Sequence, residues 1–120
     1  MPIDHVNVRC TDLEKTRAFL EEVAGLTPGD RPDFSFPGYW MYDGDGQPVL
    51  HLVKAKAELG AAGVVDHVAF RFADFAERTQ RLAAAGYEFS LREIPGTGIS
   101  QTFIAGPDGF RIELQGASPD

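Results

Sequence analysis

The chain has 120 residues, a formal net charge of -7 and a hydrophobic content of 43%. A chain of this length forms one ordinary domain, which buries enough surface to fold without a disulfide or a structural metal. Its single cysteine, Cys10, excludes an internal disulfide, and we therefore expect a reducing, cytoplasmic setting. The acidic balance argues against nucleic-acid binding, and no apolar run is long enough to cross a membrane.

The sequence repeats itself at an offset of 62 residues. Between residues 3–20 and residues 65–82, six of the eighteen aligned positions are identical. Such self-similarity indicates two copies of one structural unit, neither of which can bury its apolar face alone. We therefore predict a single domain with two modules that pack or pair. Its predicted parts are the whole domain (1–120), module 1 (1–53), an Ala- and Gly-rich connector (54–64) and module 2 (65–116).

The first module is predicted to contain a strand, a helix and three short strands. Residues 3–9 alternate and are rich in β-branched side chains, which predicts a strand. Thr11 and Glu14 have the spacing of a capping box, and Gly25 is a natural end for the helix that follows. Extended segments are then predicted at 33–36, 39–43 and 48–53.

The second module repeats this order. Its first strand is predicted at 65–72, and Asp74 with Glu77 begins a helix that ends at Gly86. Extended segments are predicted at 87–92, 100–104 and 110–115. In both modules a turn rich in Asp and Gly precedes the last strand. The repeated unit is therefore βαβββ, and the fold class is α+β.

Side chains that chelate metals fall on one face of the predicted strands. Strand side chains alternate between two faces, and the apolar row is expected to pack under the helix. The other face then receives all three histidines, His5, His51 and His67, together with Glu113 from a strongly apolar strand. The repeat relates His5 to His67 and His51 to Glu113. Three imidazoles and one carboxylate suit Zn, Fe(II), Ni, Co or Mn, so we predict a divalent metal site.

Further residues are candidates for the substrate pocket. Asn7 shares the face of His5, and large aromatic side chains could form an apolar wall, although core or dimer-interface roles stay open for them. Arginines could hold a carboxylate or phosphate, with surface ion pairs as the alternative. The aromatic candidates are Trp40, Tyr42 and Phe103, and the arginines are Arg71 and Arg111.

These motifs resemble those of the vicinal-oxygen-chelate superfamily, which includes glyoxalase I, extradiol dioxygenases, fosfomycin-resistance proteins, methylmalonyl-CoA epimerase and bleomycin-resistance proteins. The resemblance covers nearly the whole chain and rests on Asp4-His5-Val6, Asp66-His67-Val68 and the ending Pro107-Asp108-Gly109-Phe110-Arg111-Ile112-Glu113-Leu114. The ending departs from the family pattern at Gly106, where Asp is usual, and at Phe110, where Asn is usual. Both positions lie in the turn before the last strand.

The resemblance implies paired βαβββ modules that form a cupped half-barrel around a metal. It places ligands at His5, His67 and Glu113, and its fourth ligand position falls on His51. His51 could be that fourth ligand, an acid or base that does not bind metal, or a polar lining residue. Glu113, or His51 where it is not bound, would transfer the substrate proton. The resemblance also implies a homodimer.

Three functions are compatible with this site. The favoured one is a metal-dependent lyase or isomerase of the glyoxalase kind, which binds a small substrate through two neighbouring oxygens. The second is an Fe(II) extradiol-type dioxygenase, in which His5, His67 and Glu113 form a facial triad. The third is a metal-free, small-molecule-binding protein of the bleomycin-resistance kind. Retention of all four candidate ligands argues against the third.

Overall fold

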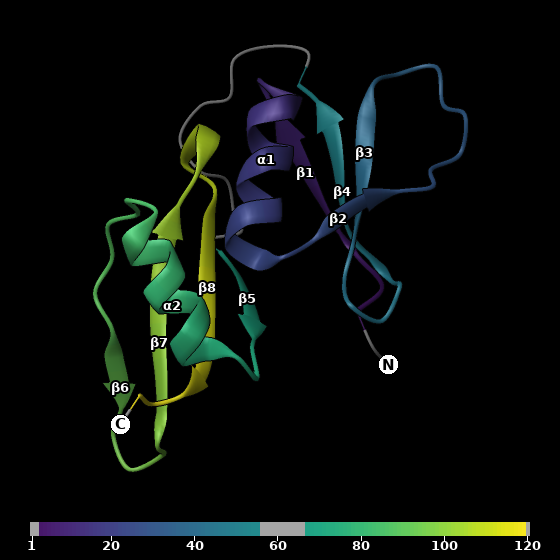
Figure 1. Cartoon of the computed structure of the whole chain (residues 1–120). Coiled ribbons are helices and arrows are strands. Elements are labelled where there is room, and N and C mark those ends of the chain that lie inside the picture. Colours follow the sequence, from purple (N-terminus) through teal and green to yellow (C-terminus); the bar gives the residue numbers. More distant parts are fainter. Residues whose placement is uncertain (1–2, 56–66, 120) are drawn as a thin grey trace. The chain divides into compact units, whose positions relative to one another are not determined.

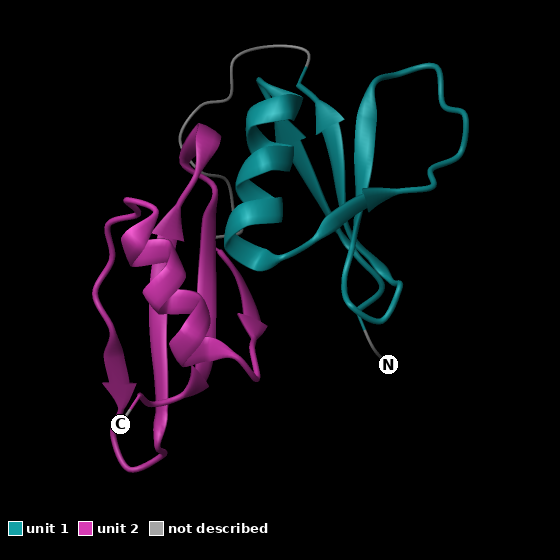
Figure 2. Cartoon of the chain, viewed as in Figure 1, with its two compact units in different colours: residues 1–61 teal, residues 62–120 magenta. Residues whose placement is uncertain are grey.

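The structure, a computed structural model, describes residues 3–55 and 67–119. The chain forms two compact units, residues 1–61 and 62–120, each with its own helix and sheet (Figure 2). Most of the predicted connector lies outside the described residues. No helix in the described ranges is long and apolar enough to span a membrane.

The first unit contains one helix on one face of a four-stranded sheet (Figure 1). The strand order is β1-β4-β3-β2, with β1 parallel to β4 and the other neighbours antiparallel. The central strand β4 therefore lies between β1 and β3. The elements are β1 (Val6–Cys10), α1 (Leu13–Ala24), β2 (Thr27–Gly29), β3 (Gly38–Tyr42) and β4 (Pro48–Lys54).

Helix α1 is capped by a different residue from the one predicted. The carboxylate of Asp12, and not the hydroxyl of Thr11, accepts a hydrogen bond from the backbone N–H of Lys15. Asp is as good a cap as Thr, because its carboxylate accepts from an N–H of the first turn and also interacts favourably with the positive end of the helix. The predicted end at Gly25 is confirmed, since that residue adopts the left-handed conformation with φ 71°.

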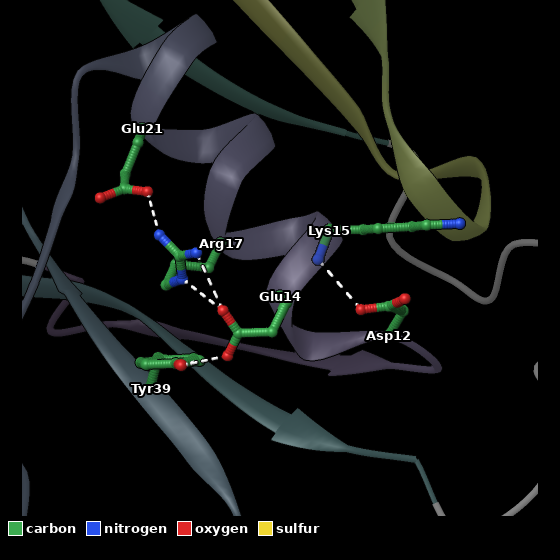
Figure 3. Close-up of polar contacts among 6 residues, drawn as sticks. All are labelled: Asp12, Glu14, Lys15, Arg17, Glu21 and Tyr39. Atoms are coloured by element: carbon green, nitrogen blue, oxygen red, sulfur yellow. Dashed lines mark hydrogen bonds and ion pairs between the residues drawn. The ribbon is translucent and has the colours of Figure 1, made fainter.

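Glu14 ties α1 to the sheet instead of completing a capping box. Its carboxylate accepts hydrogen bonds from the hydroxyl of Tyr39 on β3 and from Arg17, which also pairs with Glu21 (Figure 3). The bond from Tyr39, and then that from Arg17, lower the pKa of Glu14. Tyr39 thus lies on the helix side of β3, and its neighbour Trp40 lies on the other side.

The core of the first unit lies between α1 and the sheet. Met41, Leu50 and Leu52 of the strands are buried, as are Leu20 and Val23 of the helix. Burying an aliphatic side chain of this size contributes about 1.5–3 kcal/mol. The predicted split of the strands into an apolar, helix-facing row and an opposite row is therefore confirmed in β4.

The second unit has the same topology. Its strand order is β5-β8-β7-β6, again with one parallel pair, β5 and β8. Its core includes Phe75 of the helix and Ile112 and Leu114 of β8. The α+β class and the repeated βαβββ unit are therefore confirmed. The elements are β5 (Val68–Arg71), α2 (Phe75–Ala84), β6 (Arg92–Ile94), β7 (Ile99–Ala105), a 3-10 turn (Pro107–Gly109) and β8 (Arg111–Ala117).

Two predicted strands are misplaced. Residues 33–36 lie in the loop between β2 and β3, with a bend at 35–36. The strand of this region is β2, whose Pro28 is tolerated because β2 lies at the sheet edge. Phe34 and Phe36 alternate as they would in a strand, but both rings pack against Arg31 instead. The segment predicted at 87–92 overlaps β6 only at its last residue.

Candidate metal and substrate site

In the first unit, three candidate residues are neighbours across adjacent strands. His51 of β4 pairs with Asn7 of β1 on one side and with Trp40 of β3 on the other. Directly paired residues point to the same face of a sheet, and His5 precedes Asn7 by two residues. The topology therefore gathers these four side chains on the face opposite α1.

His51 lies between two flat rings. Its imidazole stacks on His5 with ring centroids 3.8 Å apart and an interplanar angle of 11°. On its other side it stacks on Trp40, with centroids 4.1 Å apart and an angle of 8°. The sandwich fixes the plane of the His51 ring, so its nitrogens point into neither of the stacked rings.

One nitrogen of His51 is buried without a partner. Within the described ranges, its Nε2 has no hydrogen-bond partner. Burial, and then the nearby His5, lower the pKa of His51, and the charge of Arg31 acts more weakly in the same direction. The imidazole is therefore held neutral, which is the form that binds a metal. A buried polar atom without a partner is costly and needs an explanation, which a metal would supply.

His5 is oriented by a carboxylate. Its Nδ1 lies 2.7 Å from Oδ2 of Asp4, and its side chain is 38% exposed. When Nδ1 donates to that carboxylate, Nε2 carries the lone pair. A carboxylate behind a ligating imidazole is the arrangement found in many metal sites, because it sets the ring orientation and raises its basicity.

In the second unit, Glu113 occupies the position that corresponds to His51. It pairs with Ala69 of β5 and with Phe103 of β7. Its Oε1 lies 3.2 Å from Nε2 of His67, and only 7% of its side chain is exposed. The rings of His67 and Phe103 are nearly perpendicular, with centroids 4.9 Å apart. The histidine and the carboxylate predicted for this module are therefore adjacent.

A neighbouring glutamine holds the second oxygen of Glu113. Nε2 of Gln115 donates to Oε2 of Glu113 at 2.5 Å, and Oε1 of Gln115 accepts from Arg71 at 3.5 Å, the outer limit of a hydrogen bond. The sequence analysis assigned Gln115 no role. The sequence feature that could have identified Gln115 is its Glu-x-Gln spacing from Glu113, which places both side chains on one face of the strand. Arg71, predicted to hold substrate, is here the outer member of this chain of contacts.

The remaining pocket candidates have other contacts. The guanidinium of Arg111 lies 4.7 Å from the centroid of the Phe103 ring. The hydroxyl of Tyr42 donates to the carbonyl of Asp30, so Tyr42 anchors the start of the β2–β3 loop. Phe103 and Trp40 occupy matching places beside Glu113 and His51.

The four predicted metal ligands therefore form two pairs. His5 and His51 are adjacent in the first unit, and His67 and Glu113 are adjacent in the second. Among the residues that the structure describes, no group of three His, Cys, Asp or Glu side chains is arranged to hold a metal. Each unit thus contains two candidate donors, fewer than the three or four protein ligands of a usual zinc site.

The family follows from comparison with known proteins. The sequence pattern of the Glyoxalase/Bleomycin resistance protein/Dioxygenase superfamily matches residues 2–114. The chain belongs to this superfamily. Glyoxylase I 4 of Arabidopsis thaliana is 27% identical over 93% of this chain and 68% of its own length. YwbC of Bacillus subtilis, an uncharacterized protein, is 28% identical over 93% of this chain and 94% of its own.

Solved structures of the superfamily share the fold. A Bacillus anthracis protein described as a glyoxalase family member matches with a TM-score of 0.78 and 24% identity, over 98% of this chain and 96% of that one. The fosfomycin resistance protein FosX of Listeria monocytogenes matches with a TM-score of 0.74 and 17% identity, over 98% and 91%. A FosX variant from the same organism was solved with Mn(II) and dihydroxypropylphosphonic acid.

Proposed function

We propose that this superfamily member is a metal-dependent lyase or isomerase that binds a small substrate through two neighbouring oxygens. The proposed ligands of the divalent metal are His5, His51, His67 and Glu113. The observation that carries the proposal is the Nε2 atom of His51, which is buried without a hydrogen-bond partner in the described part of the chain. The resemblance also implies a homodimer, which sedimentation of the purified protein would test.

The donor set fits a divalent metal. Three imidazoles and one carboxylate supply nitrogen and oxygen ligands, which suit Zn, Fe(II), Ni, Co or Mn. Both orienting contacts of such a site are present, from Asp4 to His5 and from Gln115 to Glu113. Mn(II) in the FosX variant supports a divalent ion in this fold. The name of the Arabidopsis relative favours glyoxalase-type chemistry over dioxygenase chemistry.

A bound metal would supply Lewis acidity that stabilises the oxyanion formed when a proton leaves the substrate carbon. The proton-transfer group is Glu113, or His51 where it is not bound to metal. Glu113 suits this role because Gln115 holds only one of its oxygens, while the other faces His67. Trp40 and Phe103 would shield the reacting carbon from water, since each ring lies beside one of these groups.

Metal analysis of protein purified without chelator tests this proposal. We expect a bound divalent ion and a melting temperature that falls when a chelator removes it, because a ligand that binds only the folded state stabilises it. Absence of bound metal, together with no metal-dependent rise in melting temperature, would show that the enzyme proposal is wrong. Oxygen uptake with catechols in the Fe(II)-loaded protein would instead identify a dioxygenase.

A further inference from the structure

An arginine lies on the same sheet face as the ring stack of the first unit. Arg31 belongs to the loop between β2 and β3. Figure 1 shows the course of this loop. A Cβ added to Gly38 would lie 3.0 Å from Nη2 and 3.3 Å from Cζ of Arg31. Gly38 precedes Trp40 by two residues on β3, so that Cβ would point to the face of Trp40 and His51. The backbone oxygen of Leu52 lies closer still to that point, so the guanidinium lies beside the place of the side chain that Gly38 lacks.

This guanidinium is held in place by the loop itself. Its Cζ lies 4.9 Å from the ring centroid of Phe34 and 5.1 Å from that of Phe36, and Nη2 donates to the carbonyl of Phe36 at 2.9 Å. The two rings stack on each other with centroids 4.9 Å apart. Tyr42 fixes the preceding residue, Asp30, through its carbonyl. A planar cation held against two rings loses little further freedom when it binds a ligand.

The charge of Arg31 has no counter-ion in the described part of the chain. The protein contains 18 acidic and 11 basic side chains, and two of the acids, Asp30 and Asp33, flank Arg31 in the loop. Even so, within residues 3–55 and 67–119 no carboxylate forms an ion pair with it. A guanidinium has five N–H donors in a fork that matches the oxygens of an anion.

The aromatic rim strengthens such a contact. Phe34 is 42% exposed and Phe36 is 47% exposed, so both rings remain open to a ligand while they exclude part of the water around Arg31. An ion pair is stronger where water is partly excluded. A small anionic group would thus gain a bidentate contact with Arg31 and an apolar contact with the two rings.

We propose that Arg31 binds the anionic group, a carboxylate or a phosphonate, of the substrate and so selects charged substrates over neutral ones. The inference rests on the proposed function for the identity of the ligand as substrate, but the anion contact itself needs no metal. Its role is in specificity, since nothing places Arg31 at the reacting carbon.

The test uses the full chain after chelator treatment, titrated at low ionic strength with methylphosphonate and, separately, with acetate. Binding is followed by the fluorescence of Trp40, the only tryptophan, and by the arginine side-chain N–H resonances. Arg31→Gln is expected to weaken binding about 10-fold or more, as loss of a charge-assisted contact does. Arg31→Lys, which keeps the charge and loses the fork, is expected to weaken it less. The control is Arg92→Gln, an equal charge change at an exposed residue of β6.

Preference for methylphosphonate or for acetate identifies the anionic group, and loss of that binding only in the Arg31 variants supports the proposal. Failure of the wild-type protein to bind either anion would overturn it. Equal weakening by Arg92→Gln would also overturn it, because the effect would then be general electrostatics. The proposal would also be overturned if the Arg31 variants changed the sedimentation of the protein but not its affinity for the anion. Phe34 and Phe36 would then belong to a contact between protein molecules. If metal binding fails and anion binding persists, only the proposed metal-dependent function is lost.

Discussion

In the first unit His51 is covered by rings on both sides, whereas Glu113, at the matching place of the second unit, is held by polar side chains. Each lies on an inner strand of its sheet, and its direct partner on the next strand, Trp40 or Phe103, points to the same face. In the first unit, ring stacking buries Nε2 of His51, which has no hydrogen-bond partner in the described part of the chain. In the second unit, a hydrogen bond from Gln115 orients the carboxylate of Glu113. The two residues thus occupy equivalent positions in the repeat, and their neighbours determine whether the side chain there is a neutral imidazole or a hydrogen-bonded carboxylate.

The residues around these two positions explain the difference. Gln115 of the second unit corresponds to Val53 of the first, which cannot donate a hydrogen bond. Gln101, the partner of Gln115 on β7, corresponds to Gly38, beside which the guanidinium of Arg31 lies. The first unit therefore combines a neutral imidazole with a nearby cation, and the second unit holds a carboxylate at the matching position.

The largest expected effect comes from removing that negative charge. Glu113→Gln should keep the contact with Gln115, because an amide oxygen still accepts a hydrogen bond. It should nevertheless weaken metal binding by more than about 100-fold, since loss of a ligand exceeds the 10- to 100-fold cost of losing the group that orients one. Competition with a metal-sensitive fluorescent chelator measures this affinity.

The matched control is Glu88→Gln, which removes one carboxylate from an exposed position of the same unit. It should leave metal affinity unchanged. Equal affinity of wild-type protein and Glu113→Gln would show that the second unit supplies no anionic ligand, and the contrast between the units would then be structural only.

A smaller effect is expected from the residue that orients Glu113. Gln115→Leu preserves volume but leaves Oε2 of Glu113 without its donor. Metal affinity should fall about 10-fold, the lower end of the range for such orienting groups. Gln101→Leu, which changes its neighbour on β7, is the control. A loss of similar size in both variants would mean that Gln115 acts through packing rather than through Glu113.

The faces of the strands could be predicted from the sequence, because the two-residue period of a strand leaves little freedom. Alternation alone placed His51 and Glu113 opposite the helices. The stacking of His51 between His5 and Trp40 could not be predicted, since it depends on strand order and register. Both β1 and β3 must be neighbours of β4, and their pairing is a long-range property.

The errors have local causes. In the β2–β3 loop, the alternation of Phe34 and Phe36 resembles that of a strand, but both rings pack against the guanidinium of Arg31. At the start of α1, Thr11 and Asp12 are adjacent acceptors, and the pattern could not decide which one would cap the helix. The convergence of the two donor pairs on one metal stays a prediction.

The smallest expected effect concerns the neutral state of His51, measured in the metal-free protein. Its pKa lies below the ordinary value of 6.5, so the folded state binds fewer protons than the unfolded state. The stability that this group contributes is complete above about pH 6.5 and is lost as the pH falls through the lowered pKa. Trp40→Leu uncovers one face of the ring, so its pKa should rise and the free energy of unfolding should depend less on pH in this range. NMR titration of the imidazole and denaturant unfolding at several pH values measure both quantities.

Phe103→Leu, the matching change in the second unit, should leave the titration of His51 unaltered. An unaltered titration of His51 in Trp40→Leu would show that the stack does not keep His51 neutral.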